Sequence, residues 1–138
     1  MIISLNGLDD CGKTTQIKNI TKKYGDTWFA YSTIKLSREI ECLSPCCFHE
    51  WWFNTSKCEE FCDEIYSSIK AGFSNLRNDA ILDKGIATFD ARVWATLVIK
   101  GLSKKDAYEL LQKKKEAARN SDIGTRTNPS SQKREIQL

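Results

Sequence analysis

The chain has 138 residues, of which 41% are hydrophobic and 28% are charged, and its formal net charge is +3. This length suits one domain with a single core, and the composition excludes a wholly disordered, collagen-like or coiled-coil chain. The sequence shows neither an apolar run long enough to span a membrane nor a basic leader with a cleavage site. We therefore expect a cytoplasmic protein with no membrane partner, whose six cysteines are reduced.

The positive charge collects toward the C-terminus. Residues 1–99 hold 11 Lys and Arg against 13 Asp and Glu, whereas residues 100–138 hold 10 against 5. A basic end can bind nucleic acid or acidic phosphates, but it is more often the solvated face of a helix. The longest lysine run, Lys113–Lys115, has only three residues, so nucleic acid is not the expected partner.

Three short apolar segments are predicted to be strands. The first is Ile2–Asn6, which is apolar on both faces, as a strand covered by helices must be. The second is Trp28–Ser32, and the third is Asp79–Asp83, which ends in a carboxylate. Helical segments separate the three strands, and this alternation is typical of α/β folds.

Four helices are predicted from spacing and from end signals. The first begins at about Lys13 and ends near Gly25, and the second follows an apolar stripe over residues 58–76. The third has inward apolar residues from Ile86 to Val98 and stops at Gly101. The fourth is a basic helix up to about Arg119, which opens on the capping residues Ser103 and Asp106. We expect a domain over residues 1–119 and a flexible, polar and basic segment over 120–138.

One segment carries a motif with a clear chemical meaning. Residues 7–14, Gly-Leu-Asp-Asp-Cys-Gly-Lys-Thr, match the pattern G-x-x-x-x-G-K-[ST] between a predicted strand and a predicted helix. Glycines let the backbone curl so that its N–H groups point at phosphate oxygens, and the helix N-terminus adds positive potential. The expected phosphate-binding residues are Gly7, Asp10, Cys11, Gly12, Lys13, Thr14 and Thr15. The alternative is a strand–turn–helix corner that needs glycine only for its geometry.

Two of these loop residues and one distant carboxylate are expected to serve ATP and Mg²⁺. Lys13 is placed to reach the β- and γ-phosphates of ATP, and the Thr14 hydroxyl can hold Mg²⁺. Asp83 ends the third strand, and ligands of open α/β sheets gather at the carboxyl ends of strands. Asp83 is therefore the second candidate ligand for Mg²⁺.

Lys84, Thr88 and Arg92 recur every four residues after Asp83 and share one face of the emerging helix. They could present two cations and a hydroxyl to a bound phosphate. The alternative is that Lys84 and Arg92 are surface residues paired with carboxylates such as Asp90.

Two segments resemble a known family. Residues 7–16 resemble the P-loop of thymidylate kinases and their relatives, in which an acidic residue lies inside the loop and Thr-Thr-Gln follows the lysine. Residues 81–85, Ile-Leu-Asp-Lys-Gly, are similar to a second motif of that family, an Asp-Arg pair that ends a strand, although Lys84 stands in place of the arginine. Arg38-Glu39 resembles the Arg-Glu pair after the second strand. The resemblance covers about residues 1–100 and implies the three-layer α/β/α fold of P-loop NTPases.

The resemblance implies phosphoryl transfer from ATP–Mg²⁺ to a nucleoside monophosphate. Lys13, Asp83 and Lys84 would be the catalytic residues. On the acceptor side, Asp9 would lie beside the sugar and Arg38 beside the phosphate. The remaining expected acceptor-binding residues are Thr88, Arg92 and Trp52, the last from the aromatic cluster at residues 49–53. The alternative for these rings is that they pack in the core.

The family's sheet has five strands and its phosphates are covered by an arginine-bearing lid, whereas only three strands are predicted here. We therefore expect an incomplete fold, in which residues 125–127, Thr-Arg-Thr, are the nearest substitute for a lid. The family's strand order would then leave the first strand at an exposed edge, which a second copy of the chain could cover. The alternative function is a truncated or degenerate chain that binds nucleotide without turnover, or a module that a partner chain completes.

Five of the six cysteines lie within residues 42–62, around the single histidine, His49. A zinc site would need four such ligands to converge. The alternative is that Cys58 and Cys62 are buried thiols, because they fit the apolar stripe of the second helix. Cys11 differs from the others because it lies in the phosphate-binding motif, at a helix N-terminus that would stabilise its thiolate.

Overall fold

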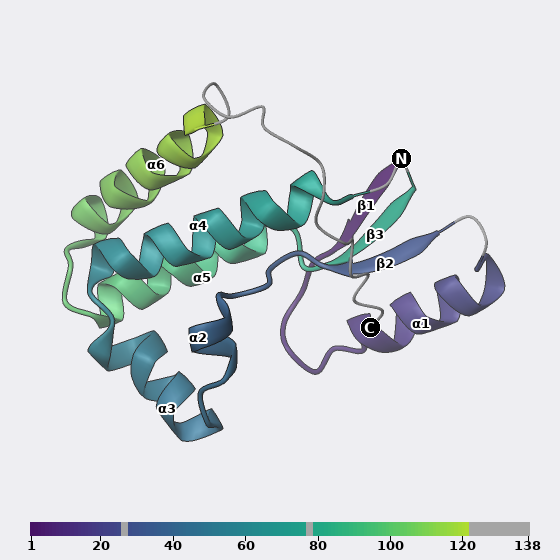
Figure 1. The fold of residues 1–138 in the computed structure, drawn as a ribbon, viewed down its shortest axis with the longest axis horizontal. Helices are drawn as coiled ribbons and strands as arrows, with labels where there is room; N and C mark the ends of the chain where they lie inside the picture. The colour runs from purple at the N-terminus through teal and green to yellow at the C-terminus, as the bar shows by residue number, and fades with distance from the viewer. Residues whose placement is uncertain (26–27, 77–78, 122–138) are drawn as a thin grey trace.

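The computed structural model describes residues 1–25, 28–76 and 79–121. Three parallel strands form one sheet: β1 (Ile2–Leu5), β2 (Phe29–Ser32) and β3 (Ala80–Asp83). Their order is β1-β3-β2, so β3 lies between the other two (Figure 1). Each strand lies within one residue of its predicted bounds, which confirms an α/β fold with a parallel sheet.

The register aligns the carboxyl ends of the three strands. Leu5 pairs with Asp83, and Ser32 pairs with Asp83 from the other side. The segments that follow the strands therefore begin at the same edge of the sheet. In parallel sheets this edge is where ligands bind, so the register positions the loop at residues 6–12 next to Asp83.

Helices lie on both sides of the sheet. Figure 1 shows α1 (Lys13–Lys23) on one side, where it contacts β2 and β3. On the other side lie α4 (Cys58–Ser74), α5 (Ile86–Ile99) and α6 (Lys104–Asn120). The four long helices follow the sequence prediction closely, which gives the expected order of a helix layer, a sheet and a second helix layer.

The main core lies among α4, α5 and α6, because each helix turns its apolar stripe toward the other two. The buried residues of this cluster are Phe61, Cys62, Ile65, Tyr66, Ile69, Phe89, Val93, Leu97, Ala107 and Leu111. The predicted end signals are confirmed: the Ser103 hydroxyl accepts a hydrogen bond from the Asp106 amide at 3.1 Å, and Gly101 adopts a φ of 103°.

The basic helix α6 is paired with acidic residues of the neighbouring helices. The Lys114 ammonium lies 2.7 Å from an Asp63 carboxylate oxygen on α4, and Lys115 pairs with Asp90 on α5. Two of the three lysines in the run Lys113–Lys115 therefore hold α6 against the core. The rest of the predicted basic segment, residues 122–138, lies outside the described residues, and so does the candidate lid at 125–127.

Three short helices connect β2 to α4 and were not predicted: α2 (Arg38–Glu41), α3 (Pro45–Glu50) and the π-helix η1 (Trp51–Thr55). They carry the aromatic cluster. The rings of Trp51 and Trp52 pack on Phe61, and the Trp52 indole N–H donates to the Thr96 hydroxyl at 3.0 Å. These contacts favour the interpretation in which the rings pack in the core.

β1 lies at one edge of the sheet formed by the described strands, as predicted. Among the described strands it pairs only with β3, and Ile2 and Ile3 remain 52% and 39% exposed. An ion pair holds the start of β1: the terminal amine of Met1 lies 2.7 Å from an Asp79 carboxylate oxygen. Coverage of this edge by a second copy stays a prediction. None of the helices in the described part of the chain is long and apolar enough to cross a membrane.

The buried hydroxyl of Tyr66 gives a stability prediction. It donates to Asp90 Oδ1 at 2.8 Å, and burial together with Asp90 raises the tyrosine's pKa above its usual range. Tyr66→Phe should lower the free energy of unfolding by about 1.5 kcal/mol, because the partly buried Asp90 carboxylate loses a donor. The raised pKa means that this contribution is fully present below pH ~10 and is lost at higher pH. Urea denaturation at pH 7 measures the loss, and Tyr108→Phe, at an exposed position of α6, is the control.

Candidate phosphate-binding site

A tight loop at residues 6–12 joins β1 to α1. Three of its residues have positive φ angles: Gly7 at 151°, Asp10 at 60° and Gly12 at 85°. Glycine adopts such angles without strain, and aspartate tolerates the left-handed region better than most residues. Gly12 directly precedes the first residue of α1. The motif therefore lies in the strand–loop–helix context that the sequence predicted.

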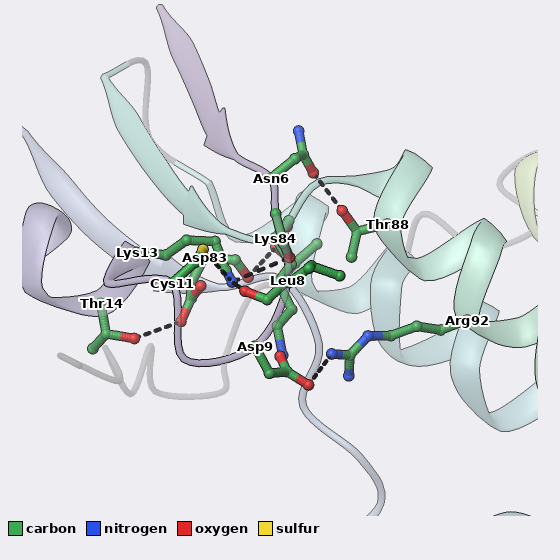
Figure 2. A network of polar contacts seen from close by, with 12 residues as sticks. Asn6, Leu8, Asp9, Cys11, Lys13, Thr14, Asp83, Lys84, Thr88 and Arg92 are labelled. Carbon is green, nitrogen blue, oxygen red and sulfur yellow. Dashed lines mark hydrogen bonds and ion pairs between the residues drawn. The ribbon is translucent and has the colours of Figure 1, made fainter.

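The Lys13 side chain lies inside the curve of this loop and is only 9% exposed. Its ammonium donates to the carbonyl oxygen of Gly7 at 3.2 Å and to that of Leu8, and lies 3.5 Å from Cys11 Sγ (Figure 2). Two loop carbonyls thus fix the position of one positive charge. This charge lies at the N-terminus of α1, where helix amides add positive potential.

Thr14 and Asp83 meet across the mouth of the loop. The Thr14 hydroxyl donates to Asp83 Oδ2 at 3.3 Å, which joins the start of α1 to the end of β3. The other oxygen, Asp83 Oδ1, is buried and has no hydrogen-bond partner among the described residues. A buried carboxylate oxygen without a partner is costly, and a bound cation would remove that cost. Hydroxyl and carboxylate oxygens are ligands that Mg²⁺ prefers, so this pair fits the predicted metal.

The turn after β3 is held by Thr33, which was not among the predicted site residues. Thr33, 1% exposed at the end of β2, donates to the carbonyl oxygen of Lys84 and lies 3.4 Å from that of Asp83. Lys84 itself has a φ of 76°, which is uncommon for a residue other than glycine. The strained turn is therefore supported from the neighbouring strand, and it directs Lys84 toward the loop (Figure 2).

Asn6 ties the loop to α5 and was also missed. Its Oδ1 accepts from the Gly85 amide at 2.8 Å and from the Thr88 hydroxyl at 2.7 Å. A Cβ at Gly85 would lie 2.7 Å from the Ser4 hydroxyl oxygen and 3.0 Å from Asn6 Oδ1, so β1 leaves no room there for a side chain. In this structure the predicted acceptor-binding residue Thr88 therefore holds the loop.

Asp9, at the tip of the loop, contacts both cations of the β3–α5 corner. Its Oδ1 lies 3.2 Å from Lys84 Nζ, and its Oδ2 accepts from Arg92 Nη2. Arg92 and Lys84 together hold the pKa of Asp9 below its usual value. Lys84 and Arg92 are therefore paired with a carboxylate, as the alternative prediction had it. Their partner is Asp9, whereas Asp90 pairs with Lys115.

A pocket of about 380 Å³ lies between the loop and the end of β3. Its lining consists of Asp9, Asp10, Gly12, Lys13, Thr14, Thr15, Asp83 and Lys84. All eight are residues that the sequence predicted for the site. Arg38 and Trp52 are not part of this lining: Arg38 is exposed at the start of α2, and Trp52 belongs to the aromatic cluster on Phe61. Arg38 and Trp52 therefore lie apart from the predicted acceptor residue Asp9, which lines the pocket.

The cysteines do not form a metal centre within the described ranges, where no three His, Cys, Asp or Glu side chains converge. Cys62 is buried in the core, and this burial raises the pKa of its thiol to about 12. Cys42, Cys46 and Cys47 are exposed on the connection between β2 and α4. Of the two cysteines predicted to be buried thiols, Cys62 is buried and Cys58 is only half-buried against the same core.

Comparisons with protein-family models, with curated proteins and with solved structures found no match to this chain. The functional interpretation therefore depends on the geometry of the pocket and on the motif residues that form it.

Proposed function

We propose that this chain binds ATP–Mg²⁺ and transfers the γ-phosphoryl group to a small phosphate acceptor of the nucleoside monophosphate class. One observation carries the proposal: the pocket holds the Lys13 ammonium, inside a glycine loop at a helix N-terminus, beside a Thr14–Asp83 pair in which one buried oxygen has no partner among the described residues. These are the parts that a triphosphate and its metal require.

Each part has a separate task in the proposed reaction. The amides of the loop and of the first turn of α1 would bind phosphate oxygens, and Lys13 would neutralise the β- and γ-phosphates. Thr14 and Asp83 would hold Mg²⁺, which would neutralise part of the negative charge of the phosphates. An acceptor phosphate oxygen would form a bond to the γ-phosphorus while the bond to the β–γ bridging oxygen breaks, and ADP leaves with that electron pair. Lys84 would stand between donor and acceptor, since it lines the same pocket.

A coupled assay of ADP release tests this function. Purified protein is mixed with ATP–Mg²⁺ and a panel of nucleosides and nucleoside monophosphates, with thymidine monophosphate tried first. We expect ADP release that depends on a monophosphate and exceeds the rate with ATP alone. Equal ADP release with and without every acceptor would exclude transfer to this class.

A second candidate, nucleotide binding without turnover, is favoured by a different observation. In the described part of the chain the sheet has three strands with β1 exposed, and Arg92 is the arginine that contacts the pocket lining. Phosphoryl transfer usually needs further positive charge to stabilise the transition state. Saturable ATP binding without ADP release in the panel assay would select this candidate.

Cys11 provides a probe of the bound state. Its side chain is exposed and its Sγ lies 3.5 Å from Lys13 Nζ, at the point where the β- and γ-phosphates would bind. We expect saturating ATP–Mg²⁺ to slow alkylation of Cys11 by iodoacetamide at least about fivefold, because the phosphates would cover the thiol. Peptide mass spectrometry measures the rate, and the exposed Cys46 serves as the internal control. An equal rate with and without ATP–Mg²⁺ would contradict the proposed binding mode.

A further inference from the structure

Two cations converge on one carboxylate at the rim of the pocket. Lys84 comes from the turn after β3 and Arg92 from the second turn of α5, and both point to Asp9 at the loop tip (Figure 2). Asp9 is 83 residues away from Arg92 in sequence, so this contact is a product of the fold. Within this contact one carboxylate charge faces two positive charges.

The two sides of this contact differ in how firmly they are held. The Asp9 side chain is 61% exposed, whereas those of Lys84 and Arg92 are 25% and 37% exposed. The backbone of Lys84 is fixed by its contact with Thr33 and by its amide, which donates to the Leu5 carbonyl at 3.1 Å. An ion pair this exposed contributes little to stability, so a competing anion can replace the carboxylate. The cations would stay in place while Asp9 turns into solvent.

We propose that Lys84 and Arg92 form a second anion site beside the loop, which the Asp9 carboxylate occupies at rest and which a phosphate monoester enters by displacing it. A phosphate monoester carries a charge between −1.5 and −2 at pH 7, so it matches the two cations better than the single charge of Asp9 does. It also offers several acceptor oxygens, and the planar guanidinium of Arg92 can bind two of them at once. The claim that the phosphate acceptor enters at this site rests on the proposed function. The claim that the two cations bind an anion does not.

The proposal gives Asp9 a role opposite to the one implied by the family resemblance. A carboxylate that binds the acceptor's sugar would help the acceptor to bind. A carboxylate that occupies the anion site competes with the acceptor instead. The two roles therefore predict changes of opposite sign when the charge of Asp9 is removed.

Calorimetric titration with thymidine monophosphate, without ATP and at low ionic strength, tests the proposal. Asp9→Asn should bind the nucleotide about fivefold more tightly than the parent chain, because an exposed competing ion pair is gone. Arg92→Gln should bind it about tenfold more weakly, because a charge-assisted contact is lost. Unchanged or weaker binding by Asp9→Asn would overturn the proposal.

Two controls separate displacement from other effects. Asp10→Asn removes the same charge from the same loop, and Asp10 contacts neither cation among the described residues. If this variant gained as much affinity as Asp9→Asn, the effect would be general electrostatics and the proposal would fail. Thymidine, which lacks the phosphate, should show no gain with Asp9→Asn; a gain would also refute the proposal. Asp9→Ser repeats the test if Asp9→Asn does not fold.

A separate titration with ATP–Mg²⁺ distinguishes this inference from the proposed function. In one outcome the parent chain does not bind ATP–Mg²⁺, while Asp9→Asn and Arg92→Gln still change the affinity for thymidine monophosphate in opposite directions. That outcome would refute ATP binding but would support the anion site. Binding of ATP–Mg²⁺ without those opposite effects would refute the anion site alone.

Discussion

Replacing Lys13 with alanine should weaken ATP–Mg²⁺ binding by about a hundredfold. The ammonium already lies inside the loop, on the Gly7 and Leu8 carbonyls, and it would turn from these carbonyls to the β- and γ-phosphates. Each charge-assisted hydrogen bond contributes about 1.5 kcal/mol, and two of them correspond to about two powers of ten in affinity. Calorimetric titration with ATP–Mg²⁺ measures the change.

The matched control for this experiment is Lys18→Ala. Lys18 lies on the same helix and is exposed, so its removal changes the net charge equally without touching the loop. Circular dichroism would verify that both variants are folded, and Lys13→Met keeps the aliphatic part of the side chain if the alanine variant is not. ATP affinity that is the same in the Lys13 variants and in the parent chain would refute the assignment of the loop.

Replacing Asp83 with asparagine should remove most of the effect of Mg²⁺ on ATP binding. Asp83 Oδ1 is buried and has no hydrogen-bond partner in the part of the chain that the structure describes. This oxygen and the adjacent Thr14 hydroxyl are the ones that fit the metal. Without the carboxylate charge, the ratio of ATP affinities with and without Mg²⁺ should fall by about a hundredfold, since a metal-bound carboxylate is a strong charged contact.

The same variant should not lower the stability of the protein without ligand, because asparagine removes a charge that the fold leaves partly unsatisfied. Thermal unfolding, followed with ATP in the presence and absence of Mg²⁺, reports both effects together. Glu116→Gln, at an exposed carboxylate on α6, controls for the change in net charge. A Mg²⁺ effect that persists in Asp83→Asn would show that the metal is held elsewhere.

The fold elements could be predicted because their signals are local. The apolar stripe of α4, the Ser103 cap of α6 and the apolar β1 segment each depend on residues within a few positions of one another. The pocket lining was predictable for the same reason: the phosphate-binding motif is continuous in sequence, and Asp83 ends a strand whose parallel pairing brings it to the loop.

The residues that were missed depend on contacts between distant segments. Asn6 and Thr33 are ordinary polar residues in sequence, and only the strand register places them against Gly85 and Lys84. The partner of Arg92 was predicted to be a nearby carboxylate such as Asp90, whereas the structure brings Asp9 from the loop. The π-helix at Trp51–Thr55 carries no simple periodic signal, and it turns Trp52 toward the core.

The contacts that join β1 and the loop at residues 6–12 to β3 and α5 link distant parts of the chain. Met1 pairs with Asp79 across 78 positions, Asn6 with Thr88 across 82, and Asp9 with Arg92 across 83. Such non-local contacts form slowly, because the intervening chain must first be closed into a loop. We therefore expect α4 and α5 to fold before β1 joins β3, and the pocket to appear late in folding. A ligand in the pocket would hold β1 and α5 together and so slow the first step of unfolding.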